Sequence, residues 1–85
     1  GILRAACGCV WNLSATNAFN TRRLGFSGAC EQVVQAMECF PSDIELFRTA
    51  CGAVLNLAMD GENSRMLGER GACELILTTM RMFPN

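Results

Sequence analysis

The feature that most constrains this chain is a nine-residue stretch that occurs twice, 44 residues apart. Residues 6–14 are ACGCVWNLS and residues 50–58 are ACGAVLNLA, so the two copies share Ala, Cys, Gly, Val, Asn and Leu in the same places. The largest difference is Trp11, which stands where the second copy has Leu55. A period in the low forties is typical of stacked helical repeats. The sequence therefore predicts an all-α fold built from copies of one unit.

The repeat continues beyond this stretch with a period of 43 residues. Residues 20–25 match 63–68, residues 28–31 match 71–74, and Phe-Pro occurs at both 40–41 and 83–84. The change of period places one more residue between Ser14 and Asn20 than between Ala58 and Asn63, and the expected site of the change is the connection 15–18, against 59–62. Because connections tolerate changes in length better than helices do, we expect a loop at both places.

The clearest helix is expected at about residues 43–58. Pro41 ends the preceding helix, Ser42 is the predicted N-cap, and Glu45 completes a capping box three residues later. Apolar residues at helical spacing predict a wide buried face. They are Phe47, Cys51, Val54 and Ala58, with Ile44, Ala50 and Leu57 beside them. A more polar stripe carries Thr49, Gly52 and Asn56, and its counterpart in the first copy carries Ala5, Gly8 and Asn12.

Two further kinds of helix are expected in each unit. Short helices at about 20–26 and 63–69 are each followed by a glycine, Gly28 or Gly71, that suits a sharp corner. The next helices carry apolar residues at spacing 0, 3, 4 and 7, which predicts one buried face on each. These residues are Cys30, Val33, Val34 and Met37 in the first unit, and Cys73, Ile76, Leu77 and Met80 in the second. Pro41 and Pro84 are predicted to end these helices.

Composition excludes several classes of function. The formal net charge is -1, which gives no field for nucleic-acid binding, and no apolar run is long enough to span a membrane. The sequence has no His, Lys or Tyr and no phosphate-cradling glycine loop, so we expect neither an enzyme nor a bound cofactor or metal.

The six cysteines are interpreted as small packing residues, because four of them recur in equivalent positions of the two units. Cys7 matches Cys51 and Cys30 matches Cys73, while Cys9 and Cys39 match Ala53 and Met82. A metal or redox site is the less favoured alternative. Six free thiols predict a reducing, intracellular compartment, cytoplasmic or nuclear.

A short helix, a glycine corner, a second helix and a long third helix ending in Asn-Leu-Ser or Asn-Leu-Ala resemble the armadillo repeat. On this resemblance the chain is one segment, 1–85. It comprises a third helix (1–14), a complete unit (19–58) and the first two helices of the next unit (62–82). The resemblance implies a right-handed α-solenoid, with helix order H3-H1-H2-H3-H1-H2, whose third helices line a concave groove.

In armadillo proteins the third-helix asparagine bonds the backbone of an extended peptide, and this role carries over to Asn12 and Asn56. The alternative is that each asparagine bonds a neighbouring helix and only holds the repeat together. Gly8 and Gly52 stand where nuclear-import adaptors of this family have tryptophan. The resemblance is therefore closer to catenin-like or general armadillo modules, and recognition of basic localisation signals is not expected.

Three other residues are candidates for contact with a partner. Trp11 is either an aromatic anchor at the groove edge or, as we favour, a side chain packed between helices. Arg22 and Arg65 occupy one position of the short helices. Solvated surface charge is the simpler interpretation for both, and a site for a partner's carboxylate is the alternative.

The predicted function is a protein-interaction module that presents a helical groove to an extended peptide or protein. The alternative is a structural spacer or self-association segment of a larger scaffold. Solenoid units bury their faces against neighbours, and about three are usually needed for independent stability. We therefore expect the chain to belong to a longer array or to associate end to end.

Overall fold

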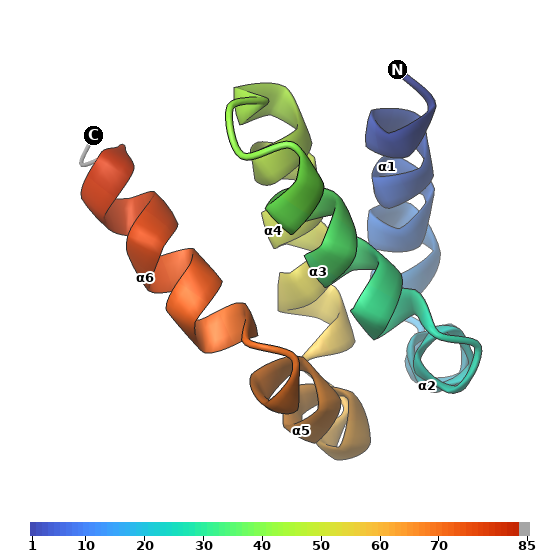
Figure 1. Ribbon diagram of the computed structural model, residues 1–85. Helices are drawn as coiled ribbons and strands as arrows, with labels where there is room; N and C mark the ends of the chain where they lie inside the picture. The colour runs from blue at the N-terminus through green and yellow to red at the C-terminus, as the bar shows by residue number, and fades with distance from the viewer. Residues whose placement is uncertain (84–85) are drawn as a thin grey trace.

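The computed structural model describes residues 1–83, and within them the chain forms six α-helices and no strand, so the predicted all-α class is confirmed (Figure 1). The helices are α1 (Ile2–Ser14), α2 (Ala18–Phe26), α3 (Ala29–Cys39), α4 (Ile44–Leu57), α5 (Gly61–Glu69) and α6 (Ala72–Met82). They form two successive sets of similar length, α1 to α3 and α4 to α6. Pro84, which was predicted to end the last helix, lies outside the described residues.

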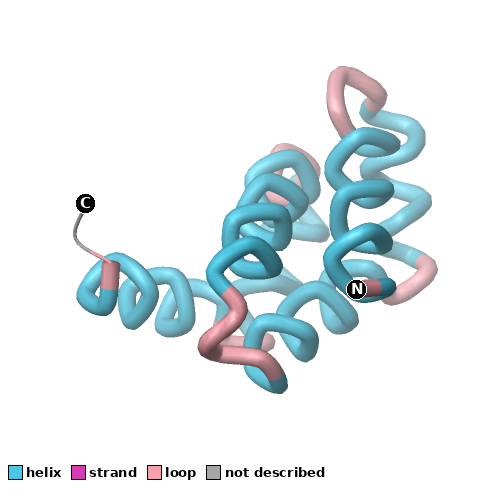
Figure 2. Tube along the Cα trace, turned by 90° about the horizontal axis from the view of Figure 1, so that it is seen from above, coloured by secondary structure: helices cyan, strands magenta, loops and turns pink. Residues whose placement is uncertain are grey.

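The two long helices, α1 and α4, lie side by side and form the most extensive contact between helices in residues 1–83. Helix α3 packs along α4, and the short helices α2 and α5 lie together at one end of the long pair (Figure 1). Helix α6 packs mainly on α5 and extends away from the other helices, as the view from above shows (Figure 2). One flank of α4 is thus covered by α1, and another by α3.

Three of the helices have an N-cap side chain, which accepts a hydrogen bond from the backbone N–H group three residues later. Asn17, Asp43 and Asp60 accept from the backbone N–H groups of residues 20, 46 and 63, at 2.9, 3.0 and 3.1 Å. The predicted N-cap at Ser42 is therefore wrong, because the Asp43 carboxylate reaches the first turn and α4 begins one residue later. Helices α2 and α5 begin two residues earlier than predicted, because Asn17 and Asp60 cap them.

The extra residue of the first connection is accommodated by a left-handed backbone. Thr16 has φ 57°, the only positive φ of a non-glycine residue in residues 1–83, between the end of α1 and the cap of α2. At the two predicted corners Gly28 and Gly71 have φ 97° and 89°. Residues with a side chain rarely adopt these φ values. Glycine is therefore required at the corner where each short helix is followed by the next helix.

The core lies between α3 and α4. The residues that are almost completely buried include Cys30, Val34 and Met37 on α3 and Leu46, Ala50, Ala53 and Leu57 on α4. The predicted buried face of α4 is correct at Phe47, Ala50, Val54 and Leu57 and wrong at Ile44, which is half exposed in the first turn. Cys51 and Ala58 are partly buried at the edge of the core.

Equivalent residues of the two units are buried differently. Val34 and Met37 are 1% exposed, whereas Leu77 and Met80, in the same places on α6, are 51% and 62% exposed. The predicted buried face of α6 is therefore largely uncovered. The reason is that α4 covers α3, whereas no helix in residues 1–83 covers α6 in the same way.

The six thiols differ in burial, and all are free. Cys7 and Cys30 are buried and Cys51 is partly buried, as the packing interpretation requires. That interpretation is wrong for the three exposed thiols, Cys9, Cys39 and Cys73. Cys30 contacts the carbonyl of Asn63 on the next short helix, and α6 has no such neighbour within the described part of the chain.

Leu57 and Leu13 provide a matched test of this arrangement, because they occupy the same place in the repeat but are 0% and 53% exposed. We expect Leu57→Ala to lower the free energy of unfolding by about 2–5 kcal/mol, since it leaves a cavity in the core. Leu13→Ala should cost less than about 1 kcal/mol. Urea denaturation in dilute solution measures both, and equal losses would contradict the described packing.

Candidate functional site

Three of the predicted site residues, Asn56, Trp11 and Gly52, meet along the line where α1 and α4 lie side by side. The Asn56 side chain donates a hydrogen bond from Nδ2 to the backbone carbonyl of Trp11, at 2.8 Å. The same carbonyl also accepts from the N–H of Ala15, at 3.1 Å. Asn56 therefore fastens α4 to the last turn of α1, as in the structural interpretation of this asparagine.

Trp11 is both packed and accessible. Its indole lies directly against Gly52, because a Cβ at that position would overlap ring atoms. The residue nevertheless remains 38% exposed. Gly8 is less tightly enclosed, since a Cβ there would meet only a methyl group of Thr49, at 3.7 Å. The two recurrent glycines thus differ, and only Gly52 is required for the close approach of the two helices.

Asn12 differs from Asn56 in the same way that the two glycines differ. It is exposed, and within residues 1–83 its side chain makes no hydrogen bond. Asn56 bonds to the helix that lies before α4 in the repeat, which is α1, and no helix in residues 1–83 takes the same place relative to α1. The structure therefore brings Asn56, Trp11 and Gly52 into contact and leaves the amide of Asn12 available on the neighbouring surface of α1.

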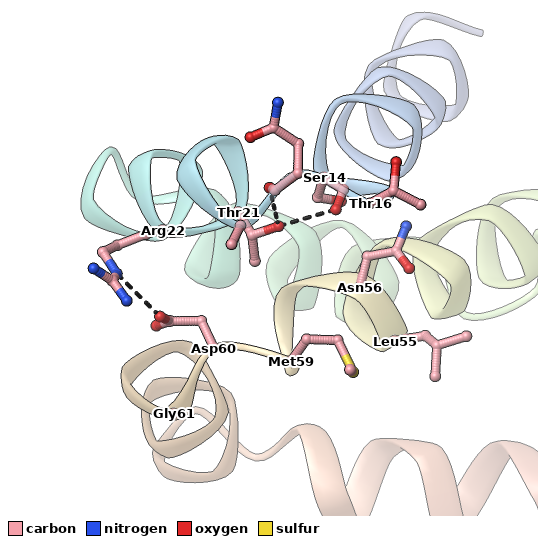
Figure 3. A pocket seen from close by; sticks show the side chains of 11 residues that line it. Ser14, Thr16, Thr21, Arg22, Leu55, Asn56, Met59, Asp60 and Gly61 are labelled. Carbon is pink, nitrogen blue, oxygen red and sulfur yellow. Dashed lines mark hydrogen bonds and ion pairs between the residues drawn. The ribbon is translucent and has the colours of Figure 1, made fainter.

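A cleft of about 760 Å³ opens where α1 and α4 end (Figure 3). Two large apolar side chains, Leu55 and Met59, line it and are mostly exposed. Asn56, Thr16 and Thr21 also line it, and Thr21 donates from Oγ1 to the carbonyl of Ser14, at 2.9 Å. The cleft thus combines an apolar contact area with hydrogen-bonding groups.

The two recurrent arginines have different partners. Arg22 reaches across to the cap of α5, where its Nε lies 3.3 Å from Asp60. Arg65 stays on its own helix and pairs with Glu62 and Glu69 at 2.9 and 2.7 Å. Arg22 therefore borders the cleft and connects the two units, whereas Arg65 forms surface pairs that contribute little to stability.

A polar contact between the short helices was not predicted from the sequence. Asn63 is 1% exposed, and its Nδ2 donates to the backbone carbonyl of Thr21, at 2.9 Å. A Cβ at Gly25 would overlap the Asn63 side chain, so this glycine admits the amide. The signal was present in the sequence, because Asn20 and Gly68 repeat the same pair in the other unit.

Likewise, the contribution of Leu55 and Met59 to the cleft was not predicted. The repeat pattern marks Leu55 only as the counterpart of Trp11, and Met59 as part of a connection. Both line the cleft because they lie near the end of α4 and in its connection to α5. No spacing rule in the sequence distinguishes these exposed apolar residues from buried ones.

Three thiols are among the groups whose pKa the fold changes. Burial, helped by the negative charges of Glu31 and Asp60, raises the pKa of Cys30 to about 11. Burial also raises the pKa of Cys7 and of Cys51. These three thiols are therefore poor nucleophiles at neutral pH.

None of the helices in residues 1–83 has the length and apolar character needed to cross a membrane. In this part of the chain, no three His, Cys, Asp or Glu side chains come together in a way that could hold a metal ion. A comparison with protein-family models finds no match, and comparisons with curated proteins and with solved structures find no significant similarity.

The first prediction from the site concerns the two asparagines. Asn56→Ala should be less stable than Asn12→Ala by about 0.5–1.5 kcal/mol, because only Asn56 loses a hydrogen bond to Trp11. Both substitutions gain the same helix propensity, so their difference isolates that bond. Urea denaturation of the two variants measures it. A lower stability for Asn12→Ala would contradict this assignment.

The second prediction concerns pH. Hydrogen bonds from the backbone N–H groups of Leu46 and Asn63 hold the pKa of Asp43 and of Asp60, respectively, below the ordinary value. Partial burial opposes this shift, and the nearby Arg4 and Arg22 add to it. A lowered pKa means that the stabilisation is complete above the unfolded-state pKa of about 4 and is lost as the pH falls through the folded-state values. We therefore expect the urea concentration at the midpoint of denaturation to decrease when the pH is lowered below about 4.

Asp60→Asn provides the control for this effect, because asparagine is the natural cap at the equivalent Asn17 and does not titrate. The variant should lose less stability than the unmodified chain between pH 7 and pH 3. Identical losses would show that Asp60 does not contribute to the acid transition.

Proposed function

We propose that this chain is a protein-interaction segment of the armadillo type, a right-handed helical solenoid in which α1 and α4 line a groove for an extended peptide or protein. The observation that carries the proposal is the accessible amide of Asn12 next to the half-exposed indole of Trp11. The cleft with Leu55 and Met59 lies where α1 and α4 end. The proposed activity is binding without catalysis, in keeping with a sequence that has no His, Lys or Tyr.

The chemistry of these groups suits an extended backbone. An asparagine side chain offers both a donor and an acceptor, so it can bond the N–H and C=O of a peptide. The amide of Asn12 has both groups available on the surface of α1. Recognition of an extended segment by main-chain hydrogen bonds, with pockets for alternate side chains, is a common mode of peptide binding.

Apolar contacts would supply much of the affinity. Tryptophan is among the residues that dominate interface energies, and the indole of Trp11 is held in place by Gly52. Met59 and Leu55 offer a second apolar contact in the cleft. Methionine adapts to partners of different shape, which suits a surface that binds side chains of a peptide.

A second candidate function is a structural segment of a larger scaffold that binds no peptide. The hydrogen bond from Asn56 to the carbonyl of Trp11 favours it, because this amide already has a partner inside the chain. The two functions make different demands on Asn12. Peptide binding needs its amide, whereas a spacer with the described packing does not.

The test is a selection of peptides from a displayed library of random linear sequences on the immobilised chain. Selected peptides should bind Asn12→Ala roughly 2- to 10-fold more weakly, which corresponds to one hydrogen bond. Gln35→Ala removes an exposed amide from α3 and is the matched control, with unchanged affinity. Isothermal titration calorimetry measures the dissociation constants. Failure to select any peptide, or equal binding to Asn12→Ala, would reject the groove in favour of the structural function.

A further inference from the structure

Two opposite faces of the chain expose apolar residues whose equivalents in the other unit are buried. On α6 the exposed Leu77 and Met80 match the buried Val34 and Met37 of α3. On α1 the exposed Ile2, Leu3 and Leu13 match the buried Leu46, Phe47 and Leu57 of α4. The contact of α3 with α4 forms the core of the chain. The two exposed faces are therefore the two halves of a contact that the chain already makes internally.

We propose that a second copy of this chain docks head to tail, with its α1 packed against α6 of the first copy as α4 packs against α3. The α1 face and the α6 face are then buried together. This inference concerns the outer faces of α1 and α6, and it shares Asn12 and Leu55 with the groove proposed for peptides. It identifies the occupant because the incoming helix has to carry the apolar pattern of α4, and α1 has that pattern, 44 residues earlier in the sequence.

Polar groups beside the two faces are equivalent to those that join the two units within the chain. Within the chain, Asn63 donates to the carbonyl of Thr21 and occupies the space left by Gly25. The equivalent space at Gly68 is open, since a Cβ there would meet nothing within 4 Å. In the docked pair the Asn20 amide of the incoming copy enters this space and donates to the carbonyl of Ser64. It exchanges its present bond to the Leu13 carbonyl for this one.

A second polar contact follows from the same correspondence. Asn56 donates to the carbonyl of Trp11, so the accessible Asn12 of the incoming copy would donate to the carbonyl of Leu55. The exposed side chain of Leu55 would then lie against Gly8 of that copy, as Trp11 lies against Gly52. Three separate features, one apolar and two polar, thus place the incoming copy in one register.

The ion pairs between units do not recur. Arg22 pairs with Asp60, but the counterpart of Asp60 on the incoming copy is the neutral Asn17. The association therefore depends on apolar burial and neutral hydrogen bonds, and added salt should not weaken it. Because the two faces differ, the contact is heterologous, and repeated docking builds an open chain of copies instead of a closed two-fold dimer.

The test uses one variant blocked at each face. Leu13→Glu places a carboxylate on the α1 face, and Leu77→Glu places one on the α6 face, both at positions that are half exposed in the single chain. Sedimentation equilibrium should show that the unmodified 9.2 kDa chain forms larger species as its concentration rises. Each variant alone should be monomeric, because burying an unpaired charge weakens the contact by more than about tenfold.

An equimolar mixture of the two variants should form a 1:1 complex and nothing larger, since each retains the face that the other lacks. Phe26→Glu is the matched control, because it changes an exposed residue outside both faces to the residue found at the equivalent Glu69. It should associate as the unmodified chain does. A monomeric unmodified chain, a mixture that stays monomeric, or either variant assembling alone would overturn the proposal.

Gly68→Ala tests the register. In the single chain the added methyl group meets nothing, and alanine favours the helix, so the melting temperature of the dilute protein should rise. In the docked pair the methyl group would overlap the incoming Asn20, so self-association should weaken by more than about tenfold. A raised melting temperature with unchanged association would overturn the proposed register.

Discussion

The contact between α1 and α4 is the interaction on which the rest of the structure depends. The absence of a side chain at Gly52 lets the Trp11 indole lie directly on α4, and Asn56 fastens the end of that contact by its bond to the Trp11 carbonyl. Helix α4 carries more buried residues than any other helix in residues 1–83. Its second flank is packed against α3, so its position determines where the core, the cleft and the outer faces lie.

Burial in this fold depends on neighbours more than on the chemistry of a residue. Leu13 and Leu57 are the same residue in the same place of the repeat, yet one is half exposed and the other is buried. Hydrophobic stabilisation is proportional to the apolar area removed from water, so only Leu57 contributes fully. Helix α6, which rests mainly on α5, is accordingly the helix that we expect to open most readily.

The recurrent asparagines show the same dependence in polar form. Asn56 and Asn63 bond carbonyls of the preceding set of helices, whereas Asn12 remains unbonded within residues 1–83. A buried amide must be paired, so Asn63 has a structural role that follows from its burial. An exposed amide carries no such requirement, which is why Asn12 can serve an outside partner. The proposed peptide site and the proposed docking face both rest on groups of this kind, left without a neighbour.

The sequence by itself determined the all-α class, the approximate positions of the helices and the glycine corners, because hydrophobic spacing, caps and left-handed glycines act within a few residues. It also showed which residues are equivalent between the two units. The error in the predicted start of α4 came from two adjacent candidate caps, Ser42 and Asp43, and the errors at α2 and α5 came from the caps Asn17 and Asp60, which were not predicted. Tertiary structure alone decided which of two equivalent residues is buried, which thiols are exposed and that Leu55 and Met59 line a cleft. The physical reason is that solvent exposure depends on the helix that lies opposite, and a repeated sequence does not state whether that helix is present.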